Sequence, residues 1–413
     1  MTLDPVHVDG IADLAGLLAR RVDDRDHDDL ARTAFEEWLD PLRVDGRPVI
    51  EPLGERRLRS VAIDDVALVD APFPTIHGLD AGTINPTTFK NGLVLDVAHA
   101  AMAAEPSDLD LHRARSLVTT VHANDPTLAL GTDWVHRDEG YFRRKILHAP
   151  RVNRYAEGVV HALALYLAES SHALEHADAV DDCLLLDGPL YPKELLNWQD
   201  RDAELGALTT EAKPRAIVEN YVRLVERLLD RDVAVAGFVK NPGAKLITRT
   251  LREKGVAAPW VDDTALFTRL LEPGDGDGDR PTDRLTFTNW FRSRGGSDRT
   301  LAADGDALGV ERRRDQTDYE VTFFVVYDPR EDLCFRVEAP AGLTRDADAR
   351  DRLTRQILRD VATARGPPPV VERADALARI GVDEKAALRR KFEERLDSPF
   401  VRTYDDVRWD EEF

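Results

Sequence analysis

The stretch TIHGLDAGT, residues 75–83, decides the fold of this chain. It predicts a short buried strand that carries one carboxylate, Asp80, to a tight turn, and the small residues around that acid would let a ligand approach the backbone. The segment 91–102 has strand character and is expected to return antiparallel beside it. Further along, the sequence CLLLDGPL at residues 183–190 ends a second apolar strand with Asp187. Two acids at the exits of two apolar strands predict a hard-metal site, because Mg²⁺ and Mn²⁺ prefer carboxylate ligands.

The composition indicates an acidic, water-soluble protein. The chain has 413 residues and a formal net charge of -21, with the charges spread along the sequence. We interpret this as a halophilic surface, adapted to a salt-rich cytoplasm. At molar salt the Debye length falls to about 3 Å, so the acidity does not exclude an anionic partner such as nucleic acid. We find no signal peptide and no apolar run of the roughly 18 residues that a membrane span needs, so a cytoplasmic protein without a membrane partner is expected.

The order of predicted elements indicates an α/β fold with a mixed five-stranded sheet flanked by helices. The sheet is expected to start antiparallel and to continue through parallel crossovers. A hairpin and further helices are expected after this core, and helices before it. The predicted core elements are strands at 75–83, 91–102 and 116–121, a helix at 154–170, a strand at 183–187, a helix at 211–230 and a strand at 233–239.

Asp80 and Asp187 are the main candidates for function, although strand-end aspartates also cap ordinary turns. Metal-assisted hydrolysis of a phosphodiester needs further carboxylates, since two cations about 4 Å apart must both be held. The helix at 154–170 offers Glu157 in its first turn and Glu169 in its last. We prefer Glu157, because the polar stretch before Asp182 reads as an insertion, and Glu169 remains the alternative.

Lys240 ends the strand at 233–239 and is a candidate for holding a scissile phosphate, although an ordinary strand-end lysine has the same pattern. The sequence HALEH at 172–176 matches the H-x-x-E-H zinc pattern but offers no third ligand, so we favour the acidic site over zinc chemistry. The chain contains no G-x-x-x-x-G-K-[ST] motif, which excludes ATP hydrolysis by a P-loop.

Four short motifs occur in a fixed order: GLDAGT at 78–83, LDGPL at 186–190, GFVK at 237–240 and FRVEAP at 335–340. Together they resemble the NurA family of DNA-repair nucleases. The resemblance implies an RNase H-like fold and Mn²⁺, or Mg²⁺ in its place, as the cofactor. It implies 5′→3′ exonuclease activity on DNA and endonuclease activity on single strands, during resection of double-strand breaks. It also implies a homodimer docked on the hexameric HerA ATPase.

The resemblance assigns roles to particular residues. Asp80, Asp187 and the helix glutamate, Glu157 by our choice, would match the family's metal-binding acids, and Lys240 would match the lysine after its fifth strand. On this basis we expect a nuclease domain at 70–385 with an insertion at about 273–318. An N-terminal helical region at 1–69 and a C-terminal helix and tail at 386–413 would flank it.

One segment departs from the family pattern. The family usually carries a tyrosine and then a histidine, and Pro367 and Asp375 stand in their places. An aspartate can bind a metal, so Asp375 joins the candidate ligands, but a proline cannot replace a phenol. This departure leaves a second hypothesis, in which the protein is a weakened or inactive relative that serves as a scaffold for the ATPase.

Overall fold

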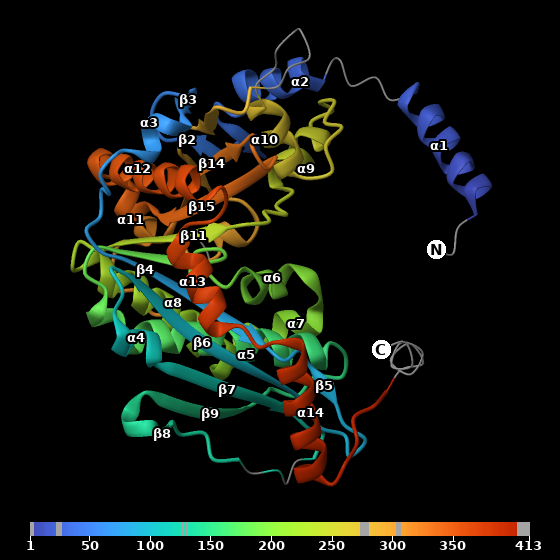
Figure 1. Ribbon diagram of the computed structural model, residues 1–413, viewed down its shortest axis with the longest axis vertical. Coiled ribbons are helices and arrows are strands. Elements are labelled where there is room, and N and C mark those ends of the chain that lie inside the picture. The colour runs from blue at the N-terminus through green and yellow to red at the C-terminus, as the bar shows by residue number, and fades with distance from the viewer. Residues whose placement is uncertain are drawn as a thin grey trace.

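The computed structural model describes residues 4–21, 27–125, 128, 130–272, 281–302 and 307–402 (Figure 1). One mixed sheet of 15 strands runs through this part of the chain, in the order β1-β2-β13-β14-β15-β11-β10-β4-β6-β7-β9-β8. Off this path, β12 pairs with β14 and β3, and β5 pairs with β6. The strands are β1 Leu42–Val44, β2 Arg47–Pro52, β3 Leu58–Ala62, β4 Ile76–Thr83, β5 Thr87–Thr88, β6 Val94–Glu105, β7 Arg115–His122, β8 Val135–Arg137, β9 Phe142–His148, β10 Cys183–Asp187, β11 Ala234–Val239, β12 Arg284–Thr288, β13 Phe291–Ser293, β14 Val321–Asp328 and β15 Leu333–Pro340.

The predicted mixed α/β fold is confirmed, and the five predicted core strands are neighbours in the middle of the sheet, in the order β7-β6-β4-β10-β11. β6 is antiparallel to both β4 and β7, whereas β4, β10 and β11 are parallel. The sheet is wider than five strands because it continues at both edges. β9 pairs with β7 on one side, and the predicted hairpin β14–β15 joins β11 on the other.

Helices cover both faces of the central strands. α5 and α8 pack on one face, and α12 and α13 on the other (Figure 1). The helices are α1 Pro5–Ala19, α2 His27–Thr33, α3 Ile63–Ala67, α4 Leu109–Arg113, α5 Ala156–Glu175, α6 Lys193–Arg201, α7 Ala203–Leu208, α8 Ala212–Leu229, α9 Leu246–Glu253, α10 Asp263–Leu271, α11 Ala341–Thr344, α12 Ala347–Ala364, α13 Pro369–Ala378 and α14 Val382–Leu396. None of them is long and apolar enough to cross a membrane, as far as the described residues go.

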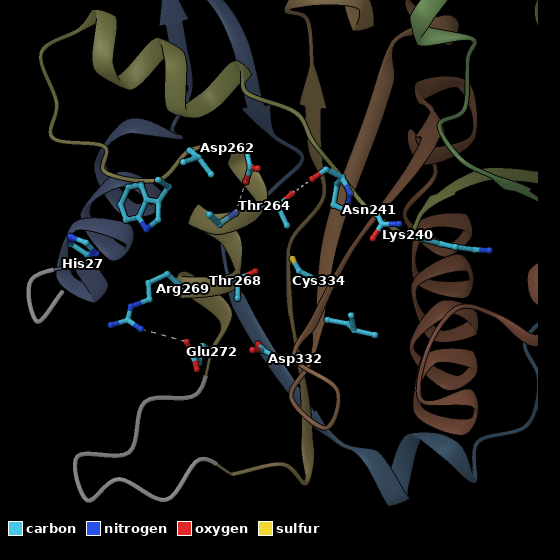
Figure 2. Close-up of a pocket in the computed structure, with 15 residues that line it drawn as sticks. His27, Lys240, Asn241, Asp262, Thr264, Thr268, Arg269, Glu272, Asp332 and Cys334 are labelled. Carbon is cyan, nitrogen blue, oxygen red and sulfur yellow. Dashed lines mark hydrogen bonds and ion pairs between the residues drawn. The ribbon is translucent and has the colours of Figure 1, made fainter. Parts of the chain in front are cut away.

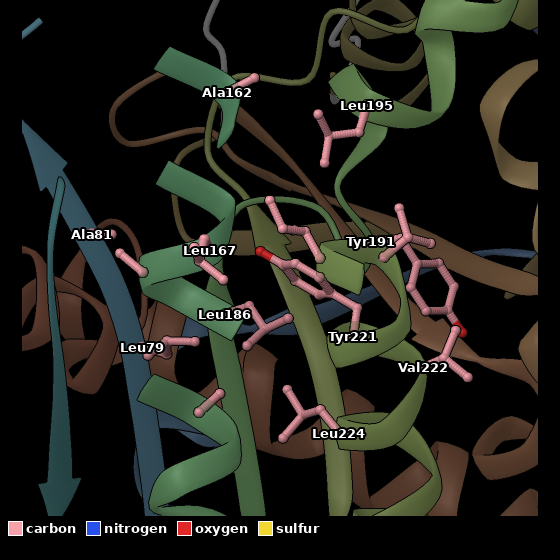
Figure 3. Packing of buried hydrophobic residues seen from close by; sticks show 14 of the residues in the cluster. Leu79, Ala81, Ala162, Leu167, Leu186, Tyr191, Leu195, Tyr221, Val222 and Leu224 are labelled. Carbon is pink, nitrogen blue, oxygen red and sulfur yellow. The ribbon is translucent and has the colours of Figure 1, made fainter. Parts of the chain in front are cut away.

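The apolar side chains of the central strands form two separate cores, because successive side chains point to opposite faces of a sheet. Leu79, Ala81 and Leu186 belong to the core beneath α5 and α8, where Tyr221 and Leu224 of α8 also pack (Figure 3). Cys183 and Leu185 belong to the core on the α12 and α13 side. The parity of the strands therefore points Asp80 and Asp187 toward α13.

The flanking regions contain more strands than the sequence indicated. The region 1–69 contains helices but also β1, β2 and β3, which join the sheet through β13 and β12. The excursion at 273–318 supplies β12 and β13 themselves. The division of the chain into three domains remains a prediction.

Candidate metal centre

The register of the sheet places two acids side by side. Leu186 on β10 pairs with Leu79 on β4, and Asp187 and Asp80 are the next residues on these parallel strands. Their side chains share one face of the sheet, as the packing of their neighbours requires. The predicted pair is therefore brought together by direct strand pairing.

Helix α13 brings a third acid to this face. Asp375 lies in α13, and one oxygen from each of Asp80, Asp187 and Asp375 lies within 4.8 Å of the other two. All three residues are partly buried. Carboxylate oxygens at such spacing suit a hard divalent cation, which needs several oxygen ligands at about 2.0–2.6 Å.

Two glycines allow α13 to approach so closely. A Cβ atom on Gly78 would lie 2.3 Å from the carbonyl oxygen of Val370, and one on Gly82 would lie 2.4 Å from that of Ala378. Both glycines share the face of Asp80, two residues before and after it. Any larger residue would push the helix backbone away, so the small residues around Asp80 serve a helix and not a ligand.

Lys240 lies beside the acids. Its Nζ donates a hydrogen bond to Oδ2 of Asp187 at 2.6 Å. A cavity of about 630 Å³ begins at Lys240 and Asn241, at the end of β11, and extends past Thr264 and Thr268 of α10 (Figure 2). Lys240 therefore stands between the carboxylates and open space.

The carboxylates are electrostatically strained without a cation. Burial raises the pKa of Asp80 to about 7, and the negative charges of Asp187 and Asp375 add to this effect. A hydrogen bond from the backbone N–H of Ala81 opposes it. Burial also raises the pKa of Asp187, whereas its hydrogen bond with Lys240 lowers it. Three acids beside two cations, Lys240 and Arg379, still leave an excess of negative charge that a divalent cation would neutralise.

The raised pKa of Asp80 predicts how stability and metal affinity depend on pH. The pKa of about 7 for folded Asp80 lies above the ordinary value of 3.8, so the metal-free folded protein binds more protons than the unfolded chain between these values. Its stability should fall as the pH rises from about 4 to about 7. Metal binding must displace the proton, so the affinity for Mn²⁺ should rise by up to about tenfold per unit below pH 7 and then level off. Thermal unfolding at several pH values, with Mn²⁺ or with a chelator, measures both trends.

The control for this prediction is Asp80→Asn, which removes the titrating group. It should remove the Asp80 contribution and leave the slope that comes from Glu169 and Asp360, whose pKa values burial raises to about 8 and about 6. The stability of this variant should therefore fall less steeply between pH 4 and pH 7 than that of the unmodified protein. A Mn²⁺ affinity that is the same at pH 6 and pH 8 in the unmodified protein would contradict the prediction.

The structure corrects the preference for Glu157. Its side chain is exposed and accepts a hydrogen bond from Oγ1 of Thr88 at 2.7 Å, away from the three acids. Twelve residues separate it from Glu169, which is about 18 Å along a helix, so the two cannot serve the same position. Glu169 is the nearer one, because the charges of Asp80 and Asp187 help burial to raise its pKa to about 8. It is buried on the α5 side and accepts a hydrogen bond from the Tyr221 hydroxyl at 2.6 Å, so it does not join the group either.

These positions predict a difference between two substitutions. Glu157→Gln should leave metal affinity and any metal-dependent activity within about twofold, because the side chain is exposed and distant. Glu169→Ala should lower the free energy of unfolding by about 1–3 kcal/mol, because the Tyr221 hydroxyl would lose its buried partner. Mn²⁺ calorimetry and urea unfolding measure the two effects. A loss of Mn²⁺ binding in Glu157→Gln would restore Glu157 as a candidate ligand.

Two other features that the sequence analysis singled out contribute nothing to the group of acids. Residues 172–176 lie in or directly after α5, and buried His172 hydrogen-bonds the Ser116 hydroxyl at 2.9 Å, so this segment belongs to a polar core network. Pro367 lies in the short link between α12 and α13 and brings no phenol to the acids.

Sequence reasoning missed Arg379, which forms an ion pair with Asp375. The signal that could have revealed this pair is the spacing of four residues along the chain.

Comparisons with known proteins identify the family and similar solved structures. A family model described as the NurA domain matches residues 74–380. The solved structure of the NurA nuclease from Sulfolobus solfataricus is similar, with 11% identity and a TM-score of 0.50 over 96% of this chain and 98% of that chain. A structure of NurA bound to dAMP and manganese has 9% identity and a TM-score of 0.44 over 97% of this chain and 98% of that one. No curated protein matches the sequence. The family match includes the positions of all three acids and of Lys240.

Proposed function

Since this chain belongs to the NurA family, we propose that it is a metal-dependent nuclease that cleaves DNA, with Mn²⁺ as its metal and Mg²⁺ as a substitute. The observation that carries the proposal is the convergence of Asp80, Asp187 and Asp375 beside Lys240. The relatives named above include a nuclease and a protein bound to manganese and a nucleotide. We also propose that the five strands from β7 to β11 form an RNase H-like core, which the single antiparallel strand β6 supports.

In the proposed mechanism the three carboxylates act deprotonated and hold the cation. The bound metal would supply Lewis acidity at the phosphodiester and lower the pKa of an attacking water. Asp80, Asp187 and Asp375 would hold the cation. Lys240, which forms an ion pair with Asp187 and lines the neighbouring cavity, would place its ammonium group against a phosphate oxygen there. Lys240 thus orients the phosphate and stabilises the charge that develops on it.

The finer parts of the proposal follow the family resemblance. We assign the protein to end resection at double-strand breaks, with 5′→3′ exonuclease and single-strand endonuclease activity, and with a HerA-type hexameric ATPase as its partner. A homodimer is the proposed working unit. These assignments rest on the family and not on any geometry described above.

The test is a metal-titrated cleavage assay in molar KCl, with single-stranded and blunt double-stranded DNA labelled at either end. The proposal expects cleavage that requires Mn²⁺ or Mg²⁺ and stops with a chelator. Addition of the ATPase should increase degradation of the double-stranded substrate. Intact DNA at all metal concentrations, from protein that binds Mn²⁺ and is folded, would refute the nuclease assignment.

A second candidate is a scaffold without catalytic activity, and the proline at position 367 favours it, because the family's phenol is missing there. In that case the protein would bind the ATPase and Mn²⁺ but leave DNA uncut. Pro367→Tyr separates the candidates, since restored cleavage in this variant would identify the missing phenol as the cause.

A further inference from the structure

The loop that joins β10 to α6 begins directly after Asp187 and lies against the backbone of β11. The N–H of Gly188 donates a hydrogen bond to the carbonyl oxygen of Phe238 at 3.0 Å. Gly237 allows this close approach, because a Cβ atom there would lie 2.4 Å from the backbone nitrogen of Leu190. A shift of this loop would therefore move the main chain next to Asp187.

Glu338 of β15 binds the same loop. It pairs across the sheet with Gly237, the residue over which the loop passes. Its Oε2 accepts a hydrogen bond from the N–H of Leu190 at 3.3 Å. Its Oε1 accepts a hydrogen bond from Nζ of Lys193, the first residue of α6. One carboxylate therefore holds the loop at two points, and its side chain is fully buried.

Glu338 belongs to a buried group of four charges that balance one another. Nε of Arg336 lies 2.7 Å from Oε1 of Glu338, and its Nη2 lies 3.0 Å from Oδ2 of Asp298. Nζ of Lys193 lies 2.9 Å from Oδ1 of Asp298. The removal of such charges from water is costly, and apolar residues of the same volume often give equal or greater stability. Stability alone therefore does not account for this group, whereas the position of the loop does.

Packing does not hold the loop on the side of this group. A cavity of about 460 Å³ is lined by Pro189 of the loop and by all four of the charged residues. Because there is open space beside Pro189, the ion pairs and the hydrogen bond to Leu190 provide the restraint. A metal site needs its ligand atoms within about 0.5 Å of their working positions, so a looser loop would be felt at Asp187.

We infer that Glu338 is a positioning residue for the candidate metal centre. It fixes the loop after β10 and, through the backbone of that loop, the carboxylate of Asp187. The inference rests on the proposed function, because it assigns Glu338 to the same site. Substitution of residues that orient metal ligands commonly changes metal affinity by 10–100-fold. Since Glu338 acts through three residues of backbone, we expect an effect at the lower end of this range.

The first test is Glu338→Gln, which keeps the shape of the side chain and removes its charge. The folded variant should bind Mn²⁺ about tenfold more weakly in calorimetry. It should also lower kcat for cleavage more than it changes KM for DNA, because Glu338 is buried and acts on the metal ligand.

Asp328→Asn is the matched control for Glu338→Gln. Asp328 is also a fully buried carboxylate of the hairpin β14–β15 and forms an ion pair with Arg330 at 2.7 Å. It pairs with Leu333, five residues before Glu338 along β15, which corresponds to about 17 Å. The control should change stability and leave the affinity for Mn²⁺ within twofold. An equal loss of Mn²⁺ affinity in the control would overturn the inference, because the loss would then follow from any buried charge in this hairpin.

Lys193→Met separates positioning from long-range electrostatics. Removal of a positive charge near the metal centre would by itself strengthen Mn²⁺ binding, whereas removal of the negative charge of Glu338 would weaken it. Positioning predicts that both variants weaken it, because both release α6 and its loop from Glu338. We expect at least threefold weaker binding in Lys193→Met. The Lys193 side chain is 24% exposed, so this variant decides the question even if Glu338→Gln does not fold.

The outcomes distinguish this inference from the proposed function. Tighter Mn²⁺ binding in Lys193→Met would overturn the inference, and so would unchanged affinity in both variants with only a loss of stability. Mn²⁺ binding by the unmodified protein without cleavage of DNA would refute the nuclease assignment and leave the role of Glu338 to be decided by affinity. An unmodified protein that binds no Mn²⁺ would overturn both.

Discussion

Replacing Asp187 with asparagine is expected to lower metal-dependent cleavage of single-stranded DNA by roughly 10²–10³-fold, which corresponds to about 3–4 kcal/mol of lost transition-state stabilisation. Asparagine keeps the shape of the side chain but removes the charge that the cation needs. Asp187 also adjoins both Asp80 and Lys240, so its loss affects the metal and the lysine together. Asp80→Asn should have an effect of similar size. Cleavage rates at saturating Mn²⁺ measure the loss of activity, and Mn²⁺ calorimetry measures the loss of metal affinity.

The same substitution should increase the stability of the metal-free protein, although it lowers activity. Burial and the neighbouring acids make a charge at this position unfavourable in the metal-free protein, so Asp187→Asn should unfold at a higher temperature in chelator than the unmodified protein. It should also lose most of the stabilisation that Mn²⁺ provides. Asp181→Asn, an exposed aspartate shortly before β10, is the matched control and should change neither property. Full activity in a folded Asp187→Asn variant would remove the acid cluster from the mechanism.

Gly82→Ala is expected to destabilise the protein by about 2–4 kcal/mol and to remove the metal site with it. The added methyl group would lie 2.4 Å from the carbonyl oxygen of Ala378, which is backbone and cannot rotate away. Helix α13 must shift, and Asp375 shifts with it. Urea unfolding should therefore show a loss of stability, and Mn²⁺ calorimetry should show a loss of metal binding, from the addition of one methyl group.

Gly158→Ala is the matched control for this prediction. Gly158 lies in α5, and a Cβ atom there would meet nothing within 4 Å. Alanine is favoured over glycine in a helix by up to about 1 kcal/mol, so this variant should be more stable than the unmodified protein. Unchanged stability in Gly82→Ala would mean that α13 packs less closely on β4 than described.

The sequence predicted the central strands and the acid pair because these signals are local. An apolar run that ends in an acid indicates a strand and its exit, and the order of elements then favours neighbouring parallel strands for Asp80 and Asp187. The strands β8 and β9 were missed, because Arg143, Arg144 and Lys145 interrupt the apolar pattern of β9. Buried Arg143 is tolerated there because it binds Ser116 and Glu175.

The choice of the helix glutamate failed for a similar reason. α5 runs to Glu175, five residues past its predicted end at Ser170, and the polar residues of this extension concealed it. His172 is buried there because it finds a partner in Ser116, which no pattern along one segment can reveal. The position of α13 was equally hidden, since it depends on a close contact with glycines almost three hundred residues earlier. Asp375 was found only through the family resemblance.

The placement of Asp375 on α13 has a consequence for synthesis of the protein. A ribosome finishes β4 and β10, with their two acids, while α13 is still untranslated. The nascent chain therefore holds only part of the cation-binding set until nearly all of its length has emerged. A prematurely terminated product would lack the third carboxylate, and with it one of the three side chains that the candidate metal centre brings together.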